Sequence, residues 1–405
     1  GTTAKASMVE GGRIARTGDY EVGAGINLSS KLVMGGGYAL KLPVIDISEI
    51  GAGGGSIVSL DRGGLLKVGP QSAGALPGPV CYGRGGEDPT FTDAALTLGF
   101  LNPGHLVGGD LKLDADRART VMENRIAQPM GLDLLDAAWG VFQVACGTMV
   151  RAVKAVSTYR GRDPRDFSLF AFGGNGPVVA AEIANLLDMT RILIPPAPGV
   201  FSAFGLLLSD VEHEISRAWL NRMADVSPAD MEAAYRQLED EMATLMLGEG
   251  YDADDYTLAR LADLRYAGQA HELTVDCPSA AGGPDFAGLT SAFGNEHERT
   301  YGHQAEAEAV ECVTLRLIAR VATDRPEQRS ISSHRTRENP APRAVYFGPI
   351  HGQVETPVID RPNLKSPVQG PVIVEEYDAT CIVPPGWTAA LDAAGNIVLT
   401  KESGS

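Results

Sequence analysis

The sequence has little cysteine, no long apolar run and no excess of positive charge. Five cysteines are scattered along 405 residues, and no two of them form a CxxC pair. An odd number of widely spaced cysteines argues against a disulfide framework or a cysteine-rich zinc site, and it is typical of a reducing cytoplasm. No stretch approaches the ~18 apolar residues of a membrane span, and the opening GTTAKASMVEGG lacks the apolar core of a signal peptide. We therefore expect a cytoplasmic protein without membrane contact.

Several common catalytic motifs are also missing. The formal net charge of −17 argues against binding nucleic acid through a basic surface. No GxxxxGK[ST] loop or GxGxxG fingerprint occurs, which disfavours a P-loop or a dinucleotide-binding fold. The histidines show no HxH or HExxH spacing, and no GxSxG elbow is present. Zinc chemistry and covalent serine catalysis are therefore disfavoured.

The apolar content, 44% of the residues, is enough for more than one core, and the length suggests about two or three domains. An apolar strand at 167–172, a helical pattern at 177–189 and a second strand at 191–196 alternate as in an α/β domain. We expect this domain to cover 1–211. Residues 212–323 mix helices and paired strands in an α+β region, 324–342 form a polar linker rich in proline, and 343–405 form an all-β tail. Local signals further predict a hairpin at Gly11–Gly12, a loop over 63–90, a helix that opens at Thr92 or Asp93, and paired strands within 256–277. They also predict a helix with Ser227 as its N-cap, Pro228 in its first turn and Gly248 at its end.

Three glycine-rich segments are the strongest functional signal. Gly51-Ala-Gly-Gly-Gly-Ser56 follows an apolar strand, Gly173-Gly-Asn-Gly176 separates a strand from a helix, and Gly1-Thr2-Thr3 is a glycine turn with two hydroxyls. Glycines let the backbone approach a ligand, and the free N–H groups at a helix N-terminus bind anions. Four glycines in five residues contribute no side chains to a core, which favours a phosphate-binding surface. The alternatives are a tight turn without ligand at 173–176 and a mobile surface loop at 51–56.

Longer motifs carry a family resemblance. GAGGGSIVSLDRGGLLKVGPQSAGALPGPVCYGRGGEDPTFTDAALTLGFLNP, then FAFGGNGPVVAAEIA, then IPPAPGVFSAFGLLLSD, and later LRYAGQAHELTV and GPVIVEEYDATCIVPPGW resemble the hydantoinase A / 5-oxoprolinase family. The resemblance covers essentially the whole chain. It implies an actin/sugar kinase/heat-shock ATPase-like fold that holds ATP between two lobes, together with Mg²⁺. The family includes N-methylhydantoinases, oxoprolinases, caprolactamase-type enzymes and subunits of acetone and acetophenone carboxylases.

The resemblance also implies a nucleotide site. The start of the chain resembles the end of the phosphate motif Asp-x-Gly-Gly-Thr, the segment 51–56 resembles the loop that closes on the phosphates, and 173–176 resembles the adenosine-side motif. The Asp before Gly1 and the whole first lobe are absent, so we expect a fragment of a longer chain. Asp46 is the tentative Mg²⁺ ligand. The expected nucleotide-binding residues are Gly1, Thr2, Thr3, Gly51, Gly53, Gly54, Gly55, Ser56, Gly173, Gly174, Asn175 and Gly176.

Three functions remain open. The first is ATP-dependent hydrolysis of a cyclic amide such as a hydantoin or 5-oxoproline, and the second is phosphorylation of a ketone enolate and bicarbonate, as in acetone-carboxylase-like complexes. The third is a non-catalytic assembly lobe. The resemblance implies a hetero-oligomer with a hydantoinase B-type subunit that carries most of the metal-dependent site.

Other candidates have structural alternatives. Asp93 is expected to be a helix N-cap rather than a catalytic carboxylate, and Cys146 an inert buried thiol. Arg84 and Lys5 could meet a phosphate, but a solvated surface position explains each of them equally well or better.

Overall fold

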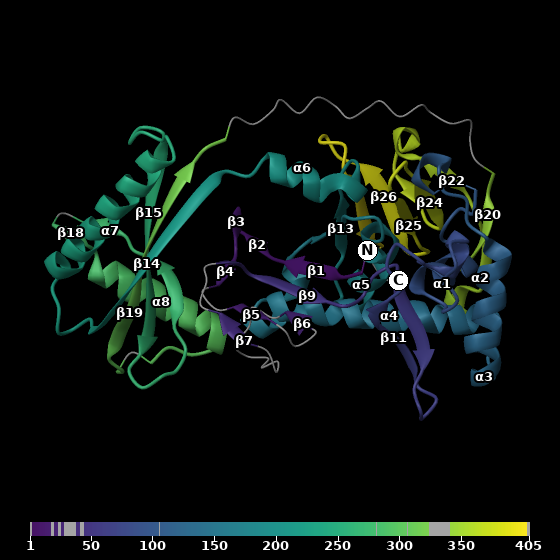
Figure 1. Ribbon diagram of the computed structural model, residues 1–405, viewed down its shortest axis with the longest axis horizontal. Coiled ribbons are helices and arrows are strands. Elements are labelled where there is room, and N and C mark those ends of the chain that lie inside the picture. The colour runs from purple at the N-terminus through teal and green to yellow at the C-terminus, as the bar shows by residue number, and fades with distance from the viewer. Residues whose placement is uncertain are drawn as a thin grey trace. The chain divides into compact units, whose positions relative to one another are not determined.

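The protein divides into two compact units in the computed structural model (Figure 1). The structure describes residues 2–17, 20–22, 26–27, 38–40, 44–104, 106–280, 282–305, 307–323 and 341–402. Unit 1 consists of Gly1–Tyr159, Asp163–Phe204 and Gln328–Ser405, and unit 2 of Arg160–Arg162 and Gly205–Glu327. The class predicted from the sequence, α/β with a C-terminal region of strands, is confirmed. Most of the predicted linker, 324–342, lies outside the described residues.

Unit 1 begins with short antiparallel strands. The hairpin predicted at Gly11–Gly12 joins β2 to β3. The predicted loop 63–90 is partly a strand, because residues 66–72 pair with β10. The described strands of this part are β1 (Ala4–Ser7), β2 (Val9–Glu10), β3 (Arg13–Ile14), β4 (Arg16–Thr17), β5 (Tyr20–Val22), β6 (Ile26–Asn27), β7 (Tyr38–Leu40), β8 (Val44–Ile45), β9 (Ile47–Ile50), β10 (Ser56–Leu60) and β11 (Leu66–Ser72).

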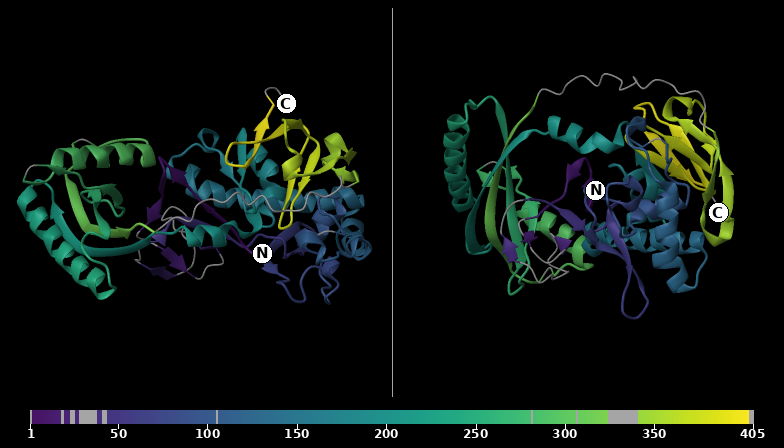
Figure 2. Two further views of the ribbon diagram at one scale, coloured as in Figure 1. Left: turned by 90° about the horizontal axis from the view of Figure 1, so that it is seen from above. Right: turned by 45° about the vertical axis from the view of Figure 1, so that its right-hand side comes forward.

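A five-stranded sheet joins residues from distant parts of the chain (Figures 1 and 2). Its order is β12-β13-β27-β26-β23; β12 is parallel to β13, and β27 pairs antiparallel with both β13 and β26. We expected 343–405 to form a separate domain, but its strands complete the sheet of β13 and belong to unit 1. The strands are β12 (Leu169–Phe170), β13 (Arg191–Ile194), β20 (Arg343–Tyr346), β21 (Gln353–Thr356), β22 (Val358–Asp360), β23 (Val368–Gln369), β24 (Val372–Glu375), β25 (Thr380–Val383), β26 (Trp387–Leu391) and β27 (Ile397–Lys401).

The helices of unit 1 cover these sheets. The long α4 begins at its N-cap Asp133 and packs against β1 and β9, and α5 packs against β13 and β25. We expected a helix to begin at Thr92 or Asp93, but the N-cap is Thr90, whose hydroxyl forms a capping box with Asp93. The helices are α1 (Phe91–Thr97), α2 (Ala115–Met122), α3 (Gln128–Met130), α4 (Leu134–Val156), α5 (Gly176–Leu186) and α9 (Gly348–His351); α6 (Phe201–Leu207) spans the boundary of the units.

Unit 2 is a four-stranded antiparallel sheet with two helices. The sheet has the order β14-β19-β15-β16, and β17 and β18 form a separate hairpin. The predicted helix with Ser227 as N-cap, Pro228 in its first turn and Gly248 at its end is confirmed. The elements are β14 (Val211–Arg222), α7 (Pro228–Gly248), β15 (Tyr256–Tyr266), β16 (Leu273–Asp276), β17 (Ser279–Ala280), β18 (Gly283–Pro284), α8 (Phe286–Tyr301) and β19 (Val310–Val321).

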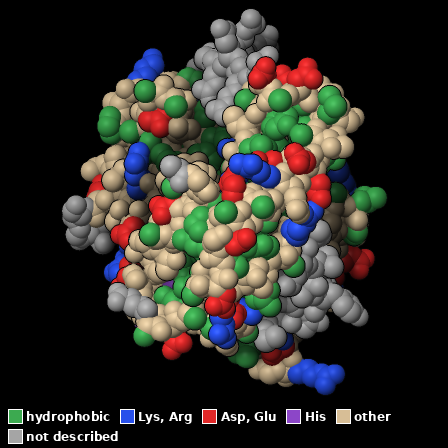
Figure 3. All heavy atoms as spheres, turned by 90° about the vertical axis from the view of Figure 1, so that its left-hand side faces the viewer, with side chains coloured by type: hydrophobic (Ala, Val, Ile, Leu, Met, Phe, Trp, Pro, Cys, Tyr) green, Lys and Arg blue, Asp and Glu red, His purple; other side chains and the backbone are tan. Residues whose placement is uncertain are grey.

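Charge is distributed as pairs of opposite sign in unit 2. Acidic and basic side chains lie interspersed on the face shown in Figure 3. In the sheet, Arg316 contacts two carboxylates, Asp263 at 2.8 Å and Glu214 at 2.7 Å, and Asp263 is only 1% exposed.

Among the helices that the structure describes, none is long and apolar enough to cross a membrane.

Candidate functional site

The turn between β12 and α5 is partly exposed. Gly174 is exposed, and Gly173 has a left-handed φ of +84°, which favours glycine. The N–H of Gly173 donates to the carbonyl of Pro198 at 2.7 Å. Asn175 is the N-cap of α5, but its side chain makes no capping hydrogen bond. The side chain of the N-cap residue therefore does not compensate the positive end of this helix, which leaves that end available to an anion.

The side chain of Asn175 lies against the second glycine segment instead. A Cβ placed on Gly54 would lie 2.5 Å from Nδ2 of Asn175 and 2.9 Å from Oγ1 of Thr92. Thr92 also donates two hydrogen bonds to the carbonyl of Gly54, from its hydroxyl at 2.8 Å and from its N–H at 3.0 Å. The two segments, more than a hundred residues apart in the sequence, are thus in direct contact.

The third segment is adjacent through strand pairing. β1 and β9 are antiparallel, and their register places Ala4 opposite Ile50. Thr3, the residue before Ala4, therefore lies next to Gly51, the residue after Ile50. Thr2 and Thr3 are both exposed, and Gly1 lies outside the described residues. The structure therefore brings together the described parts of all three predicted segments.

The loop 51–56 does not have the open surface that we expected. Residues 52–56 are buried, and the hydroxyl of Ser56, which is 0% exposed, accepts a hydrogen bond from the N–H of Gly53 at 2.8 Å. A Cβ on Gly51 would lie 2.9 Å from Pro70, and one on Gly55 would lie 2.7 Å from Ser72. Close packing thus explains the glycines that we attributed to ligand access. The loop therefore packs against the 173–176 turn through the contact of Gly54 with Asn175.

The charged candidates have structural surroundings. Asp46 is 4% exposed, and Mg²⁺ in proteins usually keeps several waters, so this position fits such an ion poorly. Within the described residues, no three His, Cys, Asp or Glu side chains gather in a metal-binding group. Asp93 is 0% exposed and accepts from the N–H groups of Cys81 and Thr90, both at 2.8 Å, which makes it a structural carboxylate. Lys5 pairs with Glu49 at 3.6 Å, and Arg84 is exposed.

The cysteines are not nucleophiles. All five are buried and free, as expected for Cys146. Burial raises the pKa of Cys146 well above its ordinary value, and burial also raises the pKa of Cys312 to about 12. Thiols in this state lack the thiolate that reacts.

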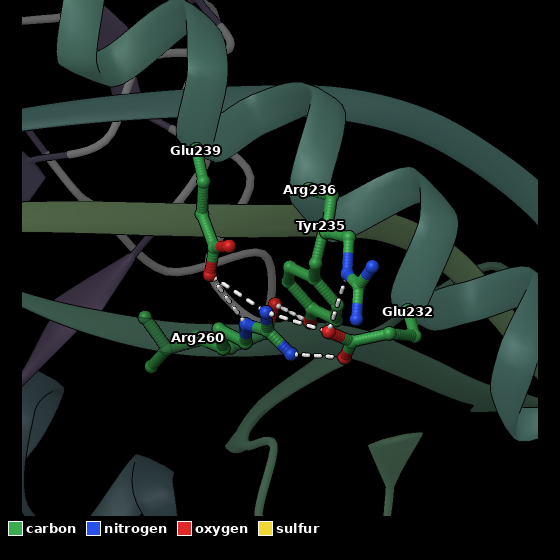
Figure 4. Close-up of polar contacts among 6 residues, drawn as sticks. Glu232, Tyr235, Arg236, Glu239 and Arg260 are labelled. Atoms are coloured by element: carbon green, nitrogen blue, oxygen red, sulfur yellow. Dashed lines mark hydrogen bonds and ion pairs between the residues drawn. The ribbon is translucent and has the colours of Figure 1, made fainter. Parts of the chain in front are cut away.

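A cleft in unit 2 is lined by charged side chains, but these side chains neutralise one another (Figure 4). Its volume is about 570 Å³. Arg260 donates to Glu232 at 2.5 Å and to Glu239 at 2.8 Å, and its guanidinium lies 4.9 Å from the ring centre of Tyr235. Arg236 contacts Glu232 at 3.1 Å. Two cations and two anions thus leave no net charge for a ligand, and this cleft is not the candidate site.

Sequence reasoning missed two contributors to the turn. Thr92 fixes the carbonyl of Gly54, and Asp378, in the tip between β24 and β25, accepts a hydrogen bond from the N–H of Gly199 at 2.7 Å. The motif YDAT around Asp378 carried the resemblance, but nothing local indicated that it lies beside residues 174 and 199.

Comparisons with known proteins agree with this architecture. The model of the hydantoinase/oxoprolinase family matches residues 1–215, and that of the hydantoinase/oxoprolinase C-terminal domain matches 221–401. An uncharacterised protein of Methanocaldococcus jannaschii is 38% identical over 98% of this chain and 56% of its own length. The alpha subunit of caprolactamase from Pseudomonas jessenii is 34% identical over 90% of this chain and 53% of its own length. The chain thus spans about half the length of these curated relatives.

Solved structures give the same answer. The crystal structure of the ATP-dependent caprolactamase from Pseudomonas jessenii superposes with a TM-score of 0.80 at 30% identity, over 96% of this chain and 59% of that one. The nucleotide-free structure of acetone carboxylase superposes with a TM-score of 0.73 at 26% identity, over 99% of this chain and 57% of that one. The α/β architecture is therefore that of the caprolactamase and acetone carboxylase structures. The chain belongs to the hydantoinase/oxoprolinase family.

Proposed function

We propose that this chain is the nucleotide-binding part of an ATP-dependent enzyme that opens a cyclic amide, such as a hydantoin or 5-oxoproline. The observation that carries the proposal is a chain of contacts among the three segments, in which Thr3 lies next to Gly51 through the β1–β9 pairing and Gly54 contacts Asn175 at the start of α5. The chain also resembles, over nearly its whole length, a caprolactamase described as ATP-dependent.

The turn would hold the adenosine side of a nucleotide, as the resemblance implies, and the exposed start of the chain would hold its phosphates. Gly174 to Gly176 offer backbone N–H groups beside the positive end of α5, and a Cβ on Gly174 would have no protein atom closer than 4.0 Å. The hydroxyls of Thr2 and Thr3 are exposed next to Gly51 and can donate to phosphate oxygens. ATP would supply the phosphoryl group that makes the carbonyl oxygen of an amide a leaving group. The protein's own task is to hold and orient the phosphates and to neutralise their charge.

The partner and the metal are part of the proposal. The caprolactamase relative is named as a subunit, which supports a hetero-oligomer here, with a hydantoinase B-type subunit as the partner that would hold the cyclic amide. Mg²⁺ would accompany the nucleotide, and since Asp46 fits the ion poorly, we assign no ligand to it in this chain. We place the assembled enzyme in the cytoplasm.

A second candidate function is carboxylation of a ketone through the same ATP chemistry. The structural similarity to acetone carboxylase, with a TM-score of 0.73, favours keeping it. ATP hydrolysis by the assembled enzyme separates the two, when it is assayed with hydantoins, 5-oxoproline, a lactam, or acetone with bicarbonate. Stimulation only by acetone with bicarbonate would reject the amide-opening reaction. The third reading, a lobe needed only for assembly, predicts that the chain contributes no nucleotide contact.

The decisive experiment is a substitution that fills the ligand surface without disturbing the fold. Gly174→Ala adds a methyl where the nearest protein atom is 4.0 Å away, so the protein should fold normally and bind Mg-ATP at least about tenfold more weakly. Calorimetric titration of the full enzyme measures this. Gly147→Ala is the matched control, because Gly147 is exposed in α4 and its added methyl meets nothing within 4 Å. Equal ATP affinity in both variants would reject the assignment of the turn.

A further inference from the structure

We propose that the tip of the β24–β25 hairpin, residues 376–379, sets the shape of the glycine turn, with Asp378 and Arg361 as positioning residues. The tip comes from the C-terminal part of the chain, about two hundred residues after the turn. Its effect on nucleotide binding rests on the proposed function, whereas its effect on the shape of the turn does not.

The first link runs from the turn to the segment that follows β13. The N–H of Gly173 donates to the carbonyl of Pro198 at 2.7 Å. Since Gly173 has a left-handed φ of +84°, this hydrogen bond fixes the direction in which the chain leaves β12. The position of Pro198 therefore determines where Gly173 and Gly174 lie.

The second link runs from that segment to the hairpin tip. The N–H of Gly199 donates to Oδ2 of Asp378 at 2.7 Å, a hydrogen bond strengthened by the charge of the carboxylate. A Cβ on Gly199 would lie 2.7 Å from the carbonyl oxygen of Asp378, and one on Gly174 would lie 4.0 Å from the same oxygen. Asp378 thus contacts the segment directly and lies beside the turn itself.

The third link is a nearly buried guanidinium. Arg361, whose side chain is 12% exposed, donates to both carboxylate oxygens of Glu376, at 2.6 and 2.8 Å. It also donates to the carbonyl of Pro195 at 2.8 Å and to that of Gly395 at 2.7 Å. A planar guanidinium with several donors holds these groups in one fixed arrangement, which an ammonium cannot do. Arg361 therefore ties the tip to the end of β13.

Backbone strain shows that the segment is held in place. Ala197, which lies between Pro195 and Gly199, has a left-handed conformation with φ of +48°. Residues with a side chain keep this conformation only where their surroundings impose it. The contacts of Arg361 at Pro195 and of Asp378 at Gly199 flank the strained residue on both sides.

The tip is also anchored on its far side. Gly108 has no side chain, and a Cβ there would lie 2.2 Å from the ring of Tyr377, so the ring packs directly on the backbone of Gly108. Any side chain at that position would displace the ring. The tip thus contacts the rest of unit 1 through Tyr377 on one side and through Asp378 on the other.

Hydrogen exchange and ATP affinity of the full enzyme test the inference together. Asp378→Ala removes the acceptor for the Gly199 N–H, so exchange of the hydrogen-bonded Gly173 N–H in the nucleotide-free protein should speed up about tenfold, with a similar loss of Mg-ATP affinity. In Asp378→Asn the amide oxygen still accepts from Gly199 but without the charge, so both changes should be clearly smaller than in Asp378→Ala. Arg361→Lys should resemble Asp378→Ala, because an ammonium cannot replace the planar fork. Gly199→Ala perturbs the same contact by overpacking, since its methyl would lie 2.7 Å from the carbonyl oxygen of Asp378, and should change both measurements in the same direction.

Arg343→Met is the matched control. Arg343 is another nearly buried arginine of unit 1, which pairs with Glu375 and donates to the carbonyls of Gly99 and Phe100 at 2.8 and 2.9 Å. Its loss should lower stability without changing exchange at the glycine turn. The inference is overturned if Asp378→Ala leaves exchange unchanged, or if Arg343→Met accelerates it equally. Should the wild type bind no ATP, the proposed function fails, and hydrogen exchange still decides whether the tip positions the turn.

Discussion

Gly54→Ala should push the loop 51–56 away from the glycine turn 173–176 of the candidate nucleotide site. The added methyl would lie 2.5 Å from Nδ2 of Asn175 and 2.9 Å from Oγ1 of Thr92, both far inside ordinary contact distance. Gly54 does not have a left-handed φ, so the effect comes from space alone. One or both neighbouring side chains must move away, and the hydroxyl of Thr92 would then lose its 2.8 Å hydrogen bond to the carbonyl of Gly54.

The magnitude follows from these two effects. Overpacking of a well-filled site costs ~1–3 kcal/mol, and loss of one neutral hydrogen bond costs ~0.5–1.5 kcal/mol. The free energy of unfolding should therefore fall by roughly 2–4 kcal/mol, and the Tm by roughly 5–10 °C. Displacement of Asn175 should also weaken Mg-ATP binding by at least about tenfold, because this residue begins α5.

Urea denaturation and calorimetric titration of the full enzyme measure both quantities. Gly147→Ala should have the opposite sign, since it replaces an exposed glycine within α4 and should stabilise the helix by ~0.5–1 kcal/mol. In the double variant Gly54→Ala/Asn175→Ala the clash with Asn175 is gone, so the two substitutions should be non-additive by at least ~1 kcal/mol. Wild-type stability of Gly54→Ala, or strict additivity in the double variant, would refute the reasoning.

Three further predictions concern stability and thiol chemistry. Asp263→Ala should lower the free energy of unfolding of unit 2 by ~3–5 kcal/mol, because it leaves the buried Arg316 with one carboxylate fewer, and a protease-resistance profile unchanged in unit 2 would contradict this. Asp93→Ala should destabilise the segment around Cys81, seen as faster hydrogen exchange of residues 80–90, and a loss of kcat with unchanged exchange would instead indicate catalysis. Since burial raises the pKa of Cys312 from 9.0 to about 12, the folded protein keeps a proton that the unfolded chain loses above pH 9, so the free energy of unfolding should fall as pH rises from 9 to 12. Cys312→Ala should flatten that slope, and an identical slope in the variant would be inconsistent with the assignment.

Local signals in the sequence were sufficient for some elements. The helix α7 was predicted in full because its limits depend on neighbouring residues: Ser227 accepts from the N–H of Asp230, Pro228 suits the first turn, and the helix ends at Gly248. The hairpin at Gly11–Gly12 and the pairing of β15 with β16 follow from turn chemistry and alternation in the same way. Such elements need no information from distant parts of the chain.

The arrangement of the site depends on distant contacts, and there the sequence was insufficient. The glycine-rich segment 51–55 follows a strand, as the sequence predicts, but its packing was not predicted, because Pro70, Ser72 and Asn175 approach it only after folding. The same holds for Asp93. Its carboxylate accepts hydrogen bonds from the N–H groups of residues 80 and 81, which lie in a segment that precedes it in the chain. The pairing of β27 with β13 joins strands about two hundred residues apart, which no local pattern encodes.

The insertion of β27 between β13 and β26 has a consequence for the order of events on the ribosome. The inner strand β13, whose Ile192 and Ile194 are fully buried in the finished protein, is synthesised long before the strand that covers its open side. Unit 2 is complete in sequence by then and can fold while β12 and β13 wait with an unpaired, apolar edge. A nascent chain stalled before residue 397 should therefore recruit chaperones at β13, and release of the last strand should end that dependence.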